Sequence, residues 1–431
     1  MRFFLPQDIT ALGGHVDQVL ELAGKRRWLA RADELDREKS ISSYRWKIVA
    51  DYHWLEMAIA HQYDVLTKVG QLAEAHADTL TRAAVNFAGT VVEVHRRSSP
   101  KGQKQLEGRL RDALNATTGF AALFLEMDLA QRLIDQGCDV EFPDLEGRAN
   151  YDLAFSREDF IGEVECKSLS ADAGRQIHRK DFYRFVDALR PAIERRSAGA
   201  TGDLVLITLA GRLSSAQDKQ AILLRAAEEV LGGKTPANRK DQLFRVERYT
   251  VKEVLGTSVR TSEEVQSRCT ARFGPNLHIA GALTAPGEGC LVVMRSEKED
   301  DTSTPQLEAM RKAASQFSGK RPAFIAMQCH GVELGDLLSP HWRRRVGILS
   351  YALYGHYGAG HVNATYITGF GALVLDEGRI GTPAFAIPNP KPRYPATASQ
   401  APTFLGSISD QEFADAIGLP LPAPNISQLD F

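Results

Sequence analysis

Asp152, Glu165 and Lys167 bring two carboxylates and one ammonium group into a single short stretch of the chain. Two carboxylates about 4 Å apart repel each other by roughly 4 kcal/mol at an effective dielectric constant near 20, so such a pair takes up a proton or binds a cation. Carboxylate oxygens with open coordination positions suit Mg²⁺ or Mn²⁺. A neighbouring lysine can orient a water molecule or stabilise charge that develops on a phosphate group. These residue types therefore indicate a metal site with phosphate chemistry.

A β-hairpin over residues 149–168 would bring these three side chains together. Apolar and polar residues alternate on both sides of a polar turn in this range. The alternation puts Glu165 and Lys167 on one face of the second strand and turns Cys166 toward a core. With the turn at the centre of the range, Asp152 lies directly opposite Glu165 and on the same side of the sheet.

The hairpin resembles the PD-(D/E)xK nuclease superfamily, whose members share the restriction-endonuclease-like fold. The resemblance covers roughly residues 106–210 and rests on Asp152 and on Glu165-x-Lys167, the only (Asp/Glu)-x-Lys in the sequence. It implies that Asp152 and Glu165 bind Mg²⁺ or Mn²⁺ and that Lys167 orients the attacking water. It also implies that the backbone carbonyl of Cys166 completes the metal site. The competing interpretation is an exposed strand edge with alternating charges.

A glutamate on the preceding predicted helix, residues 106–136, is the candidate third acid. Glu126 falls on the apolar face that should be buried, where a carboxylate is costly unless it is paired or bound to a metal. The resemblance implies that this glutamate approaches the metal, whereas pairing with a core arginine would explain it equally well. Asp144 follows Pro143 in a predicted turn. We rank it below Asp152, because a turn holds a side chain less firmly than a strand does.

A basic segment directly after the hairpin is the candidate nucleic-acid contact. Its members are Arg175, Gln176, His178, Arg179 and Lys180. They are the residue types that meet a phosphate backbone, although a solvated helix start explains them equally well. The net charge of −2 means that any DNA binding must come from local basic patches. The expected partner is nucleic acid, above all DNA, and cutting of both strands would favour a homodimer.

The length of 431 residues and the apolar pattern predict an α/β protein of several domains. We expect a helical N-terminal region over residues 1–105 and a nuclease-like core over 106–215. We expect a C-terminal α/β extension over 216–387 and a proline-rich flexible tail over 388–431. By the resemblance, the core is a mixed sheet flanked by helices in the order helix, three strands, helix, strand, and its last strand covers residues 202–209.

The composition indicates a cytoplasmic protein. The five cysteines are scattered and form no Cys-x-x-Cys pair, which disfavours a zinc ribbon and a disulfide framework. No stretch approaches about 18 consecutive apolar residues, so we expect no membrane span. The first residues lack the apolar core of a signal peptide.

The leading hypothesis is a Mg²⁺-dependent endonuclease or exonuclease that hydrolyses DNA phosphodiester bonds, and the resemblance associates it with defence, restriction or repair. The alternative is a catalytically inactive nuclease-fold protein that acts as a nucleic-acid-binding or protein-interaction module. The near-neutral charge and the large part of the chain outside the resemblance are compatible with that alternative. In a third interpretation, Glu165 and Lys167 form a structural ion pair along the strand.

Overall fold

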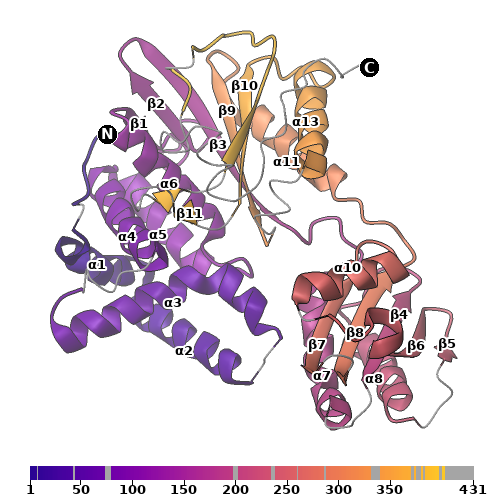
Figure 1. Ribbon diagram of the computed structural model, residues 1–431. Helices are drawn as coiled ribbons and strands as arrows, with labels where there is room; N and C mark the ends of the chain where they lie inside the picture. The colour runs from indigo at the N-terminus through magenta and orange to yellow at the C-terminus, as the bar shows by residue number, and fades with distance from the viewer. Residues whose placement is uncertain are drawn as a thin grey trace. The chain divides into compact units, whose positions relative to one another are not determined.

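The computed structural model shows a mixed α/β chain of two compact units, each with its own mixed sheet (Figure 1). It describes residues 1–6, 8–41, 44–72, 79–197, 202–233, 238–259, 261–285, 288–331, 340–369, 373–374, 380–381, 384–397 and 400–402. The first unit comprises Met1–Asp36, Ala50–Ala171 and Gln306–Phe431, and the second comprises Arg37–Val49 and Asp172–Pro305. The predicted α/β class is therefore confirmed.

The N-terminal part of the chain is helical, as the sequence predicted. Its elements are η1 (Ile9–Leu12), α1 (Gly13–Ala23), α2 (Lys25–Ile41), α3 (Trp46–Val69), α4 (Thr79–Arg97), α5 (Pro100–Asn115) and α6 (Ala121–Asp135). Their apolar stripes meet one face of the first sheet in a single core, where Trp28 and Phe120 lie in the same cluster as Val164. This shared core holds α5 and α6 firmly against the sheet.

The first sheet has the strand order β1-β2-β3-β9-β10-β13. The strands are β1 (Asp139–Glu141), β2 (Leu153–Arg157), β3 (Phe160–Ser170), β9 (Ala323–His330), β10 (Val362–Gly369) and β13 (Ala384–Pro388). β1, β2 and β3 pair antiparallel, β3 and β10 flank β9 in parallel, and β13 closes the sheet antiparallel. Helices α11 (Ser303–Gln316) and α13 (Pro340–Gly355) pack on the face opposite the N-terminal helices, where Met310 and Val346 join Ile325 in one cluster.

The neighbour of β3 differs from the expected one. The strand predicted over residues 202–209 exists as β4 (Asp203–Leu209), but it belongs to the second sheet. β3 pairs instead with β9, from Glu163 opposite Ala323 to Ser170 opposite His330. The reason is that Asp172–Pro305 forms part of a separate unit between β3 and α11, and a run of apolar residues does not specify which strand it will pair with.

The second unit is a three-layer α/β structure. Its sheet has the order β5-β6-β4-β8-β7 and contains β5 (Asn238–Lys240), β6 (Phe244–Thr250), β4, β8 (Glu288–Ser296) and β7 (His278–Ala285). Helices α7 (Arg179–Ser197) and α8 (Gln217–Leu231) cover one face, and α9 (Val251–Leu255) and α10 (Ser262–Phe273) cover the other. The backbone N–H of Asp301 donates to the carbonyl of Gly174 at 2.9 Å, so the two ends of the inserted segment meet.

The described start of the proline-rich tail is held against the first unit. The side-chain amide of Asn363 donates to the carbonyl of Tyr394 at 2.8 Å, and the Tyr394 hydroxyl donates to the carbonyl of Gly319 at 3.2 Å. The rest of the predicted flexible tail, residues 403–431, lies outside the described residues. A short ribbon, β11 (Leu373–Val374) with β12 (Ile380–Gly381), precedes β13. None of the helices in the described part of the chain is long and apolar enough to cross a membrane.

Candidate active site

The hairpin of β2 and β3 has the register that places Asp152 opposite Glu165. Leu153 pairs with Val164, and the next step toward the start of β2 brings Asp152 to Glu165. The Asp152 backbone N–H donates to Glu165 Oε2 at 3.2 Å. In turn, the Cys166 backbone N–H donates to Asp152 Oδ2 at 2.7 Å. Each carboxylate is thus held by a main-chain donor of the other strand, while the Cys166 side chain points into the core with Val164.

Lys167 is held by two acceptors on the face of β3 that α11 covers. Its Nζ donates to Glu165 Oε1 and, at 2.8 Å, to Oε1 of Gln316. Gln316 is the last residue of α11, and its Nε2 donates to the carbonyl of Asn150 at 2.8 Å. Sequence reasoning missed Gln316, because only the pairing of β3 with β9 brings α11 to this place. Gln316 therefore ties Lys167 to the segment that carries Asp152.

Glu126 is buried on α6, as its place on the apolar face predicted, and an arginine is paired with it. Arg109 on α5 donates to Glu126 Oε2 at 2.6 Å and also to the carboxylate of Asp144. Asp144, which the sequence analysis ranked below Asp152, thus joins the same cluster. Sequence reasoning missed Arg109, although a signal existed. Arg109 lies three residues after the buried Leu106 and one residue before the buried Leu110, on the apolar stripe of its helix.

Burial and mutual repulsion raise the pKa values of these carboxylic acids. Burial, reinforced by the charge of Asp144, raises the pKa of Asp152 to about 6, although the Cys166 N–H, Lys167 and Arg109 oppose the rise. Burial and then the charge of Asp152 raise the pKa of Glu165 to about 8, and Lys167 opposes this rise. The pKa of Glu126 lies well above its ordinary value, chiefly because of burial and then because of Asp152.

The cluster carries an excess of negative charge when it is fully ionised. Its carboxylates are Glu126, Asp144, Asp152 and Glu165, and its cations are Arg109 and Lys167, so two negative charges stay unbalanced. The exposed fractions of Asp152, Glu165 and Glu126 are 7%, 1% and 8%, so water screens this charge poorly. Such a cluster gains stability from protons or from one divalent cation.

The donor set fits Mg²⁺ or Mn²⁺ better than a metal that needs a full cage of protein ligands. Among the residues that the structure describes, no three His, Cys, Asp or Glu side chains gather closely enough to hold a metal ion by themselves. Mg²⁺ keeps several water ligands and is commonly bound by one or two carboxylates. Asp152 and Glu165 meet that requirement, whereas Glu126 would first have to release Arg109.

The predicted nucleic-acid-contacting residues belong to the second unit, whereas the acidic cluster belongs to the first. The Gln176 backbone N–H donates to Asp300 at 2.8 Å, and Arg179 Nε donates to Asp172 at 3.3 Å. The His178 ring lies 2.8 Å from a guanidinium nitrogen of Arg212. Two members of the segment therefore already have carboxylate partners. Arg175 and Lys180 are the remaining members of the segment. Within its own unit, the segment fits a folded helix start at least as well as a phosphate-binding surface.

No protein-family model, curated protein or solved structure matches this chain.

Proposed function

We propose that this protein is a metal-dependent phosphodiesterase that hydrolyses nucleic acid, above all DNA. The observation that carries the proposal is the pair of buried carboxylates, Asp152 and Glu165, on two adjacent strands with the ammonium group of Lys167 beside them. Both acids have raised pKa values, so the site favours a bound cation over two uncompensated carboxylate charges.

The order of the elements in the first unit supports the restriction-endonuclease-like fold. That order is α6, β1, β2, β3, α11 and β9, with three antiparallel strands and then a parallel partner for β3. It is the helix, three strands, helix, strand sequence that the PD-(D/E)xK resemblance implies. Here α11 and β9 supply the last two elements, and Asp172–Pro305 is inserted before them.

The residues take the following roles in the proposal. Asp152 and Glu165 hold Mg²⁺ or Mn²⁺, with the backbone carbonyl of Cys166 and a rearranged Glu126 as further ligands. When bound, the ion supplies positive charge next to the phosphodiester. Lys167, positioned by Gln316, orients the attacking water or stabilises charge on the phosphate oxygens in the transition state. The water oxygen forms a bond to phosphorus and gives up a proton, the bond from phosphorus to the leaving oxygen breaks, and that oxygen takes up a proton.

The raised pKa values predict how cleavage depends on pH. A carboxylate must lose its proton before it can bind a cation, so protons compete with Mg²⁺ at Asp152 and Glu165. At limiting Mg²⁺, the rate should rise as pH increases from about 6 to about 8, the pKa values of the two acids. At high Mg²⁺ the rise should move to lower pH, because the cation displaces the protons. A rate that is independent of pH at limiting Mg²⁺ would contradict this assignment.

Cleavage assays test the proposal directly. Supercoiled plasmid, duplex and single-stranded oligonucleotides and RNA are incubated with Mg²⁺ or Mn²⁺. Asp152→Asn and Lys167→Ala should lose activity by at least about 100-fold. Glu141→Gln is the matched control, because Glu141 is an exposed acid that pairs with Arg148 outside the cluster. The proposal is wrong if the wild type cleaves none of these substrates, or if either site variant cleaves like the wild type.

One observation favours the alternative of a catalytically inactive nucleic-acid-binding or protein-interaction module. Lys167 pairs with Glu165, and Arg109 pairs with Glu126, so two of the acids have cationic partners without any metal. Calorimetric titration with Mg²⁺ and Mn²⁺ separates the two functions. Salt-dependent DNA binding without metal binding would support the inactive module.

A further inference from the structure

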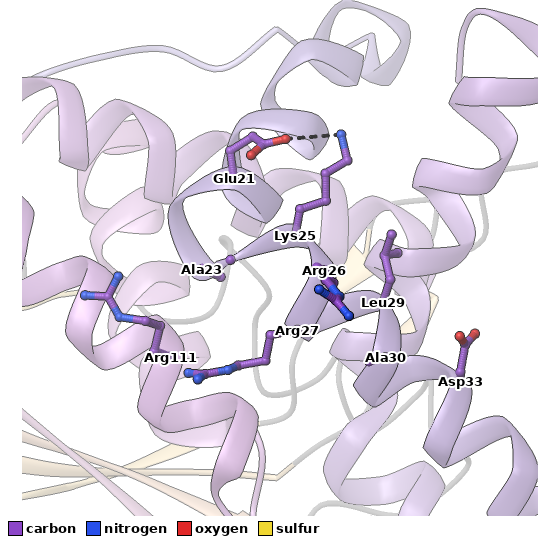
Figure 2. A pocket seen from close by; sticks show the side chains of 10 residues that line it. Glu21, Ala23, Lys25, Arg26, Arg27, Leu29, Ala30, Asp33 and Arg111 are labelled. Carbon is purple, nitrogen blue, oxygen red and sulfur yellow. Dashed lines mark ion pairs between the residues drawn. The ribbon is translucent and has the colours of Figure 1, made fainter.

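A basic depression lies on the first unit at the junction of α1 and α2, opposite Arg111 of α5 (Figure 2). Its volume is about 1110 Å³. The charged residues that line it are Glu21, Lys25, Arg26, Arg27, Asp33 and Arg111. Gly24, with φ of 93°, separates the two helices and lets α2 begin at the rim.

The arginines supply the free positive charge of this depression. Lys25 already binds Asp17 at 2.6 Å and Glu21 at 3.2 Å. Arg26 and Arg27 are exposed, and within the described residues neither forms an ion pair with a carboxylate. Arg111 has a loose pair with Glu107 at 3.8 Å, and 42% of its side chain is exposed.

The arrangement of these groups suits a phosphate-type anion. Figure 2 shows Arg27 extending from α2 toward Arg111, which comes from a different helix. Guanidinium groups on one concave surface repel each other, and an anion between them relieves that repulsion. Guanidinium also matches phosphate oxygens with two parallel hydrogen bonds. The first turn of α2 adds the positive end of a helix of 17 residues.

Helix α5 connects this depression to the candidate active site. It carries Arg109, which binds Glu126, and also Arg111, two residues further along. Residues two apart in a helix point to nearly opposite sides of a cylinder about 10 Å across. Arg111 therefore lies on the side of α5 away from the buried stripe that carries Arg109.

We propose that the Arg26–Arg27–Arg111 depression binds backbone phosphates of the nucleic acid. The inference rests on the proposed function for its substrate class. Its test measures binding without metal, so that the result does not depend on cleavage.

The test compares the wild type with an Arg27→Ala/Arg111→Ala double variant. A fluorescently labelled single-stranded oligonucleotide is titrated in chelator at several salt concentrations, and anisotropy gives the dissociation constant. Loss of two phosphate contacts should reduce the slope of log K against log salt by about 1.4 and weaken binding about 25-fold at 0.1 M salt. Arg31→Ala is the matched control, because Arg31 lies one turn further along α2 and already pairs with Glu34 at 2.7 Å. Circular dichroism and thermal melting check that every variant is folded.

Three results would overturn the inference: no binding by the wild type, an unchanged slope in the double variant, or an equal loss in Arg31→Ala. Calorimetry with inorganic phosphate separates a nucleic-acid backbone from a free anion. If the double variant loses phosphate binding but keeps its oligonucleotide affinity, the depression is a small-anion site and the inference is wrong. If the wild type binds and the double variant shows the expected loss, but no substrate is cleaved with Mg²⁺, the inference holds and the proposed phosphodiesterase function fails.

Discussion

Replacing Asp152 with asparagine should make the metal-free protein more stable at neutral and alkaline pH. Asp152 is buried beside other carboxylates, and this surrounding raises its pKa from 3.8 to about 6. The folded state therefore holds the proton more tightly than the unfolded state does. Between these two pKa values the wild type loses stability as pH rises, and above the upper one the loss is complete. Asparagine has no proton to lose, and its side-chain oxygen can still accept from the Cys166 N–H.

The expected gain follows from the size of this pKa rise. Each pKa unit corresponds to about 1.4 kcal/mol, so Asp152→Asn should raise the free energy of unfolding by about 3 kcal/mol at pH 8. At pH 4 the wild-type carboxyl is largely protonated in the folded state, and the gain should fall below about 1 kcal/mol. Saturating Mg²⁺ should reduce the difference, because a cation at ten times its dissociation constant stabilises the wild type by about 1.4 kcal/mol.

Urea unfolding in chelator at pH 4 and pH 8, followed by tryptophan fluorescence, measures this difference. Three of the four tryptophans, Trp28, Trp54 and Trp342, lie in the unit that carries the site, so the signal reports mainly on that unit. Glu141→Gln removes an exposed carboxylate and should change stability little at either pH. An Asp152→Asn variant that is no more stable than the wild type at pH 8 would refute the reasoning that repulsion and burial strain this cluster.

Arg109→Ala should destabilise the first unit by about 3 kcal/mol, because it leaves the buried Glu126 and the partly buried Asp144 without their cation. A smaller loss at low pH in a urea titration would confirm the cause. Gly119→Ala should lower the free energy of unfolding by at least about 2 kcal/mol, since φ there is 54° and a Cβ would lie 2.6 Å from the Tyr52 carbonyl oxygen. A thermal melt like that of the wild type would contradict this. A variant in which Gly174 is joined directly to Asp301, without residues 175–300, should keep a first unit that unfolds cooperatively, because the backbones of Gly174 and Asp301 are already hydrogen-bonded. An aggregated or molten product would show that the inserted segment is needed for folding.

The local part of the site could be predicted from the sequence. The alternation of apolar and polar residues over 149–168 defines the hairpin. The register of that hairpin decides which residue faces Glu165. The helical period likewise places Glu126 on a buried face. Both inferences use contacts between residues that are close in sequence, where periodicity and turn chemistry carry the information.

The distant part of the site could not be predicted in this way. The partner of β3 is β9, which lies beyond an inserted unit, and nothing in the apolar run of β4 shows that it joins another sheet. Gln316 reaches Lys167 only through that pairing. Arg109 could have been recognised as a charge on an apolar stripe, but its two acceptors come from a different helix and a turn.

The position of β3 within the sheet explains how the site tolerates so large an insertion. A parallel pair needs a crossover connection, and Asp172–Pro305 occupies the crossover between β3 and β9. Because the ends of the inserted segment meet at Gly174 and Asp301, its length places no demand on the register of the two strands. β3 is paired on both edges, with β2 and with β9, so Glu165 and Lys167 project from a strand that cannot shift without breaking two ladders. A site that must hold two like charges close together needs such a rigid support, since repulsion would otherwise move them apart.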